Sequence, residues 1–440
     1  MKHTITAGLC LLTAGPVLAG HGIDAILEMA GQSPTTGQQI IAADHEAGLG
    51  EIGVNRSGAL PRLDLSLNAS RVSSANLSGQ PGSGTGRADG SSYDWSLQLS
   101  QPLFAFGRIM TVWKMAGAGR QLLDLQHRQQ QNRYRDRIIA AYGDALLSRD
   151  RQQTSEMSVS QLKAVLEFTR LEYNGGARDK VDLLQARSAW EKAVADAALH
   201  RAEAEVLLNR LKVILGREND ADFSLATRPE PEAAFLRIRE PTGQSGTSLD
   251  QKVLAARAAL TELRADYEGA GHWPTLSLFG SATGRAWSFP PLVDDAATDA
   301  FAADRRDYAV GLRLDWTLFA GLGISAAHRK ARATARRDRL ELEEKQKLAA
   351  GDRLAARRRF EAGGLIFRAA KSAGHAAQLA LAKAEADYKG GTLPMTLLIK
   401  AEKDWRESRW RLTEAWIHWL QAASGLRQIL GQQDEGSRHP

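Results

Sequence analysis

The sequence predicts an α+β fold of two tandem repeats, each joining two amphipathic strands to a hairpin of very long helices. The first observation is internal repetition: the stretch from Tyr173 to Trp190 recurs without a gap from Tyr388 to Trp405, an offset of 215 residues (388 − 173). The second is that four short segments alternate apolar and polar residues. The third is a pair of long, proline-free segments in which charged residues are mixed with Leu, Val, Ile and Ala. A repeat of this size has to be recognised before the fold is assigned, because it sets the number of elements.

The first residues have the pattern of a secretory signal. Lys2 and His3 precede an apolar run, and Val17 and Ala19 stand at the −3 and −1 positions of a predicted cleavage site after Ala19. The run is shorter than the ~20 apolar residues that a membrane-spanning helix needs. The only cysteine, Cys10, lies inside this leader. The exported chain would therefore lack disulfides, zinc–thiolate sites and a cysteine nucleophile.

Four strands are predicted from a period of two residues. In residues 60–70 Leu alternates with Asp, Ser and Asn, and in 93–100 Tyr, Trp and Leu alternate with Asp, Ser and Gln. Residues 79–92 between them are rich in Gly and Ser and are predicted to form a loop. The pattern returns in 273–284 and 308–316 of the second repeat, with a loop between these segments.

The helices are predicted from the absence of proline and from heptad-like spacing. The segment from 109 to 172 would form a rod of roughly 96 Å if it were fully helical. The Gly175–Gly176 pair breaks it, and a second helix follows to about 215. In the second repeat, helices are predicted over 323–389 and from Pro394 to about 430.

These elements divide the chain into five parts. After the signal peptide 1–19 come the first repeat 20–215, a linker 216–247, the second repeat 248–430 and a disordered tail 431–440. The linker is predicted from its three prolines, Pro229, Pro231 and Pro241.

The strand pattern is that of strands in an outer-membrane barrel, which are apolar on one face and polar on the other. Aromatic residues near the strand ends suit a membrane-interface belt: Tyr93, Trp95, Trp273, Tyr308 and Trp316. Four strands cannot close a barrel, because the smallest barrels have about eight. We therefore expect several chains to share one barrel. The alternative, a small soluble sheet that caps a helical bundle, explains neither the aromatic residues nor the helix lengths.

The chain resembles the TolC family of outer-membrane efflux proteins over residues 21–430. Three features carry the resemblance: the duplicated Tyr-x-Gly-Gly…Leu-x-x-Ala…Trp hairpins, the Leu-Pro-x-Leu and Trp-Pro-x-Leu strand openings, and the Pro-Leu-Phe and Thr-Leu-Phe strand exits. The resemblance implies a homotrimer with a twelve-stranded barrel, four strands from each chain, that continues into a long periplasmic α-helical barrel. It implies an outer-membrane exit duct of a tripartite efflux or type I secretion system. Such a duct works with a periplasmic adaptor (membrane fusion protein) and an inner-membrane transporter.

The resemblance also implies sites at the two hairpin turns. The adaptor would dock on the residues of both tips: Gly175, Gly176, Ala177, Arg178, Gly390, Gly391, Thr392 and Leu393. Capping of the helices by the glycines is compatible with this role. The periplasmic gate would involve Asp182 and Lys400, although the residue equivalent to Asp182 in the second repeat is Leu397.

The sequence offers no catalytic constellation, so we expect no enzyme activity and no cofactor. The histidines are scattered without paired spacing, which argues against a metal site. The arginine-rich run from 329 to 359 is interleaved with acidic residues, so no nucleic-acid partner is expected. The alternative function is a secreted or periplasmic coiled-coil structural protein without a channel. The sequence leaves open whether a drug, a metal, a polysaccharide or a protein is exported.

Overall fold

The fold is given by a computed structural model. It describes residues 21–32, 35–75, 87–226, 229–238, 247–288 and 305–431. The predicted signal peptide lies outside the described residues, as does the predicted tail apart from Gly431.

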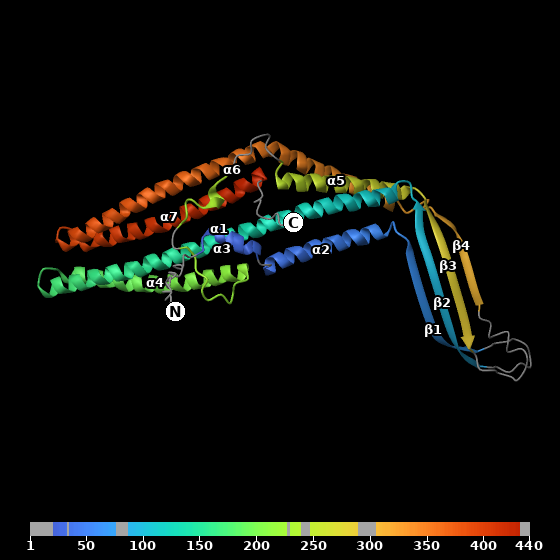
Figure 1. The fold of residues 1–440 in the computed structure, drawn as a ribbon, viewed down its shortest axis with the longest axis horizontal. Coiled ribbons are helices and arrows are strands. Elements are labelled where there is room, and N and C mark those ends of the chain that lie inside the picture. The colour runs from blue at the N-terminus through green and yellow to red at the C-terminus, as the bar shows by residue number, and fades with distance from the viewer. Residues whose placement is uncertain are drawn as a thin grey trace, which may run out of the picture. The chain divides into compact units, whose positions relative to one another are not determined.

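The described chain consists of long helices and one small sheet (Figure 1). The first half contains α1 (Ile23–Gln32), α2 (Thr36–Ser57), β1 (Arg62–Ala75), β2 (Arg87–Phe104), α3 (Arg108–Asn174) and α4 (Lys180–Leu215). A 3-10 turn, η1 (Ala234–Leu236), precedes the second half. The second half contains α5 (Leu249–Gly269), the 3-10 turn η2 (Ala270–His272), β3 (Thr275–Ser288), β4 (Arg305–Asp315), α6 (Gly323–Lys389) and α7 (Met395–Leu430).

The predicted elements are confirmed, with one correction at the strands. Residues 87–92, predicted to be loop, belong to β2 and pair with the end of β1, from Ser70 opposite Ser92 to Ala75 opposite Arg87. Their Gly- and Ser-rich sequence shows no alternation, so only the pairing with β1 makes them a strand.

The chain divides into two compact units. One comprises Met1–Ala43, His127–Leu249 and Lys347–Pro440, and the other Asp44–Gln126 and Asp250–Gln346. The first unit holds the hairpins of the long helices, and the second holds the sheet.

The sheet in the second unit is antiparallel, with the strands in sequence order. The pairing register gathers the apolar residues on one face, because residues opposite each other on neighbouring strands share a face. Leu65 is opposite Leu97, and Leu97 is opposite Ala282. Farther along, Leu278 is opposite Leu312. Leu65 and Leu312 on the edge strands are exposed in the single chain, whereas Leu97, Leu278 and Ala282 on the inner strands are only partly exposed.

The opposite face of the sheet is polar. Ser66 lies opposite Ser96, and Ser96 opposite Thr283. The hydroxyls of Ser66 and Ser96 are hydrogen-bonded at 2.7 Å. The predicted strand amphipathicity is therefore confirmed in three dimensions.

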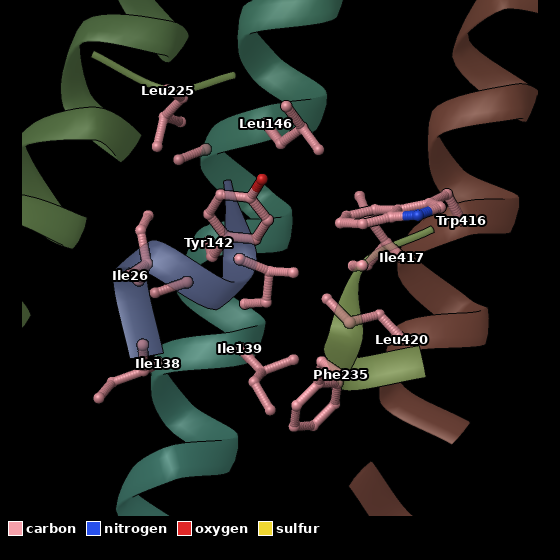
Figure 2. Packing of buried hydrophobic residues seen from close by; sticks show 14 of the residues in the cluster. Ile26, Ile138, Ile139, Tyr142, Leu146, Leu225, Phe235, Trp416, Ile417 and Leu420 are labelled. Carbon is pink, nitrogen blue, oxygen red and sulfur yellow. The ribbon is translucent and has the colours of Figure 1, made fainter. Parts of the chain in front are cut away.

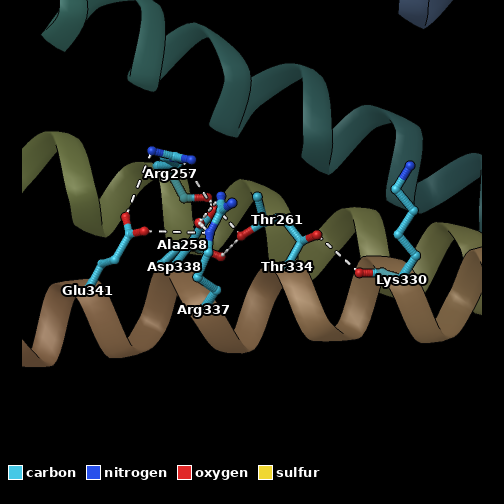
Figure 3. A network of polar contacts seen from close by, with 8 residues as sticks. All are labelled: Arg257, Ala258, Thr261, Lys330, Thr334, Arg337, Asp338 and Glu341. Carbon is cyan, nitrogen blue, oxygen red and sulfur yellow. Dashed lines mark hydrogen bonds and ion pairs between the residues drawn. The ribbon is translucent and has the colours of Figure 1, made fainter.

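Part of the basic run of α6 pairs with acidic residues in this unit (Figure 3). Asp338 is buried between α5 and α6, and its carboxylate is 3.3 Å from Arg257 Nε and 2.6 Å from Arg337 Nη2. Glu341 extends the cluster, at 3.9 Å from Arg257 and 3.5 Å from Arg337. A buried carboxylate is tolerated only when paired in this way, so the network fixes α5 on α6.

The core of the first unit lies where the linker crosses the long helices (Figure 2). Tyr142 of α3 and Trp416 of α7 are fully buried, with ring centroids 6.1 Å apart. The predicted linker is partly ordered, since Leu225 and Phe235 enter this core. Asp24 accepts hydrogen bonds from the backbone N–H groups of the η1 turn, at 2.7 and 3.0 Å.

Candidate functional site

The two helical hairpins of the first unit have the same dimensions. Figure 1 shows α4 folded back along α3, and α7 folded back along α6. The long helices α3 and α6 each have 67 residues, and the return helices α4 and α7 each have 36. Corresponding helices start 215 residues apart (323 − 108 and 395 − 180), the offset of the sequence repeat.

Each hairpin turn begins with the same glycine cap. Gly176 has φ 77°, its N–H donates to the Tyr173 carbonyl at 3.0 Å, and the Ala177 N–H donates to the Glu172 carbonyl at 2.8 Å. This pair of bonds is a Schellman motif, which needs a residue in the left-handed conformation. Gly391 repeats it with the same φ. The predicted helix-ending role of the glycines is confirmed.

The return helices begin with different residues. The side chain of Asp179 accepts a hydrogen bond from the Lys180 N–H at 2.6 Å and so caps α4. Pro394 takes the equivalent position before α7 and has no side-chain oxygen to offer. The two tips therefore share a backbone geometry and differ in chemistry.

The two hairpins meet at Tyr388, near the tips. Its side chain is only 1% exposed, and its hydroxyl is hydrogen-bonded to Thr169 Oγ1 at 2.7 Å. The Arg178 guanidinium lies 4.3 Å from the centre of the Tyr388 ring and donates to the Tyr388 carbonyl. Phe168 meets the ring edge-on, with centroids 6.2 Å apart. The first hairpin, formed by α3 and α4, thus holds the end of α6 through the Thr169 hydroxyl, the Arg178 guanidinium and the Phe168 ring.

The predicted site residues are distributed unequally around this contact. The structure brings Arg178 and Asp182 together, with a 3.8 Å ion pair between them, and both side chains are largely shielded. Lys400 is exposed on α7. The remaining residues predicted for adaptor docking are exposed, except Leu393, which packs partly buried against the neighbouring apolar cluster: Gly175, Gly176, Ala177, Gly390, Gly391 and Thr392.

Farther from the tips, polar side chains join α3 to α7. We call this set the polar seam. It consists of Asp136 with Ser424 and Gln428, Asp150 with Thr413 and Arg409, Arg151 with Glu414, and Ser158 with Glu402. Most of these groups are buried or half-buried, so each partner satisfies a polar atom that would otherwise be costly to bury.

Burial shifts two titrating groups in this region. Desolvation raises the pKa of Asp150, and the hydrogen bond from Thr413 and the charge of Arg409 oppose this shift. Desolvation lowers the pKa of His200 on α4, which is hydrogen-bonded to Ser155 at 2.7 Å. The fold therefore favours the neutral imidazole beside the polar seam.

The sequence did not predict the Tyr388 contact or the polar seam. The signal that could have found them is the difference between the two copies. Thr169 and Arg178 of the first hairpin are replaced by Ala384 and Leu393 in the second. Among the described residues, no group of three or more His, Cys, Asp or Glu side chains is placed to hold a metal ion. No helix in the described part of the chain is long and apolar enough to cross a membrane.

Comparison with known proteins agrees with this geometry. Residues 39–217 match the family described as Outer membrane efflux protein. The proteases secretion protein PrtF of Dickeya chrysanthemi is 23% identical over 409 residues, covering 89% of this chain and 84% of PrtF. The alkaline protease secretion protein AprF of Pseudomonas aeruginosa is 25% identical over 317 residues, covering 70% of this chain and 63% of AprF.

The fold is also that of a solved channel. The crystal structure of the Campylobacter jejuni CmeC outer membrane channel superposes with a TM-score of 0.73 at 14% identity, covering 93% of this chain and 85% of CmeC. Residues 39–217 are thus similar to the Outer membrane efflux protein family, and the chain has the fold of a solved outer membrane channel.

Proposed function

We propose that this protein is a passive exit duct in the outer membrane, part of a tripartite efflux or type I secretion system. The observation that carries the proposal is the sheet, whose apolar face is continuous across four strands and is most exposed on the edge strands β1 and β4 of the single chain. An exposed apolar face of this size needs either a partner or a lipid environment. For a chain similar to outer-membrane efflux proteins, lipid is the environment that fits.

Three chains would complete the membrane part. One chain leaves β1 and β4 at the edges of its sheet, and open edges invite pairing with another chain. If β4 of each chain pairs with β1 of the next, three chains close a barrel of twelve strands. Tyr308 and Trp316 lie eight residues apart (316 − 308), which is about 26 Å along the strand. That spacing matches an outer apolar band about 25 Å tall between two aromatic girdles.

The aromatic residues support this placement. Trp273 and Trp316 lie at the end of the sheet where Thr275 pairs with Asp315, and the Trp316 Nε1–H donates to the His272 carbonyl at 3.2 Å. Tyr93 and Tyr308 lie toward the other end and are exposed. Trp95 lies over Gly284, where any side chain would collide with its ring. We propose these residues as the two interfacial belts.

The long helices of three chains would form the periplasmic duct. A helix of 67 residues is about 100 Å long, far more than a globular core requires. The exposed tip residues would meet a periplasmic adaptor, which connects the duct to an inner-membrane transporter. Both curated relatives are named for protease secretion, which favours an exported protein as the substrate.

The experiment that tests the duct is cell fractionation followed by gel electrophoresis without heating. We expect the protein in the outer-membrane fraction, migrating as a trimer that heating converts to monomer. A soluble periplasmic rod would contradict the duct and favour the alternative, a coiled-coil structural protein.

The gate is a second part of the proposal. We propose that three copies of Asp182, and beyond them Lys400, line the closed periplasmic entrance. Arg178 restrains Asp182 from within the same chain, at 3.8 Å, so Asp182→Ala would remove both the charge and this restraint. We expect the variant to increase the leak through the closed channel and to weaken its block by cations.

The matched control is Glu191→Ala. Glu191 lies on the same helix, is exposed, and pairs with Arg187 at 2.9 Å with the same spacing in sequence. If Asp182→Ala and Glu191→Ala leave leak and cation block equally unchanged, Asp182 is only a solvated helix charge.

A further inference from the structure

We propose that Phe279 and Arg313, on the polar face of the sheet, form a binding site for carboxylate groups of an exported polypeptide. The proposal rests on the proposed duct, in which the polar face of each sheet lines the lumen of the barrel. It adds which residues of the wall contact the exported chain, and by which chemistry.

Phe279 stands among small side chains on the polar face. Its neighbours two residues away on β3 are Ser277 and Ser281, and the residues opposite it are Ser100 on β2 and Gly311 on β4. Among the positions on this face whose side chains the structure describes, Phe279 is the only aromatic residue. An aromatic ring on a wall that faces water departs from the alternation of the strand and calls for a physical reason.

The Phe279 ring lies over the backbone of Gly311. A Cβ atom added to Gly311 would be 2.9 Å from Phe279 Cε1 and 3.1 Å from Phe279 Cζ. A residue with a side chain at this position would therefore displace the ring. The glycine of β4 thus fixes where the ring of β3 lies, and the ring remains only partly buried.

Arg313 lies next to this ring. It follows Gly311 by two residues on β4, so it is the diagonal neighbour of Phe279 on the same face. Its guanidinium carbon lies 5.1 Å from the centre of the Phe279 ring. A cation–π contact attracts the charge through the ring and needs no oxygen acceptor, so the N–H donors of Arg313 stay available.

The other two arginines on this face with described side chains are already paired. Arg62 Nε lies 2.8 Å from the Asp64 carboxylate, and Arg285 is paired with Asp94.

Arg313 has no ion pair and no conventional hydrogen bond within the described part of the chain, although Asp315 follows it by two residues on the same face. The planar fork of a guanidinium fits a carboxylate, which can accept two N–H groups side by side. The site therefore combines an apolar ring with a free carboxylate receptor.

The site lies at the height of the proposed outer apolar band, since Gly311 lies between Tyr308 and Trp316 in the sequence. Twelve strands about 4.8 Å apart and tilted by about 40° enclose a lumen roughly 24 Å across, measured between backbones. Three such sites on the wall would leave this lumen open. Each would hold a passing chain weakly and release it, as conduction requires.

An extended polypeptide is the ligand that fits both parts of the site. The carboxylate of an Asp or Glu would accept hydrogen bonds from Arg313, and a neighbouring apolar side chain would pack on the exposed part of the Phe279 ring. Both curated relatives are named for protease secretion, which agrees with a polypeptide in transit.

Single-channel recording in the presence of a peptide tests the site. The probe is an unstructured peptide of Gly and Ser with interspersed Asp and Phe, and the comparison peptide has Asn in place of Asp. In the wild-type channel the Asp peptide should interrupt the current for longer than the Asn peptide. Arg313→Gln should remove this difference. Phe279→Ala should shorten the interruptions by both peptides roughly fivefold, the effect of one lost aromatic contact.

Arg306→Gln is the matched control. Arg306 is exposed on the same strand, and its register opposite Gly284 places it on the apolar face, outside the lumen. The interruptions should keep their wild-type length in this variant. If Arg306→Gln and Arg313→Gln change them equally, the effect is one of net charge and the site is wrong. Binding of benzoate, a small apolar anion, without discrimination between the two peptides would also overturn a polypeptide as the ligand.

Assembly is measured separately, because Phe279→Ala also removes a contact between β3 and β4. The trimer on unheated gels and the conductance without peptide should match those of the wild type. If Phe279→Ala does not assemble, Arg313→Gln decides the proposal, because Arg313 is exposed and has no polar partner in the described chain.

The same recordings separate the site from the duct. A wild-type trimer without conductance steps contradicts the proposed duct. Conductance steps that both peptides interrupt equally in the wild type contradict the site alone.

Discussion

Tyr173 and Tyr388 occupy equivalent positions and have different surroundings. Tyr388 is buried against the first hairpin of its own chain, while Tyr173 is 38% exposed. The difference lies in the neighbours, since only the first hairpin supplies the hydroxyl of Thr169 and the guanidinium of Arg178. At this scale the two halves of the chain are not interchangeable.

Tyr388→Phe tests this asymmetry. Removing the hydroxyl breaks the buried hydrogen bond to Thr169 and should lower the free energy of unfolding by about 1 kcal/mol. Tyr173→Phe is the matched control and should change the free energy of unfolding little. The measurement is urea unfolding in detergent, followed by helix circular dichroism. Equal effects of the two substitutions would show that the Tyr388 contact does not stabilise the fold.

The chemistry at this scale was only partly predictable. The unequal tips were visible in the sequence, as Arg178 against Leu393 and Asp179 against Pro394. The sequence did not show whether Tyr173 or Tyr388 is buried. That depends on which face of the first hairpin, α3 and α4, packs against the second hairpin, α6 and α7. Periodicity within one helix does not contain this information.

At the scale of elements, glycine and proline set the boundaries. The long helices end at the predicted glycine pairs because Gly176 and Gly391 adopt a left-handed conformation that other residues rarely accept. The helix ends could therefore be predicted to within a few residues. The strand ends could not, because residues 87–92 have no alternation and become a strand only by pairing with β1.

Gly176→Ala tests the glycine cap. An added methyl group meets nothing within 4 Å, so the cost is the left-handed conformation itself, about 1–2 kcal/mol. Gly175→Ala is the control, since Gly175 does not have a positive φ and an added methyl group makes ordinary contacts there. The apparent melting temperature of each variant measures the difference. A loss in Gly175→Ala as large as in Gly176→Ala would rule out the cap as the cause.

At the scale of the whole molecule, the described part of the single chain exposes two apolar surfaces. One is the apolar face of the sheet, and the other consists of exposed apolar residues on α4, with Leu365 and Ile366 on α6. The amphipathic strands were predictable, because alternation shows directly in the sequence. The packing of the linker was not, since a short segment such as 216–238 has no period that reports its contacts.

The central claim is that this chain forms a channel through the outer membrane. Its most direct test is single-channel recording of the purified protein in planar lipid bilayers. We expect discrete conductance steps from the trimer, and no steps from the heat-dissociated monomer. A trimer that incorporates into the bilayer without any conductance steps, while a porin under the same conditions gives them, would contradict a channel function.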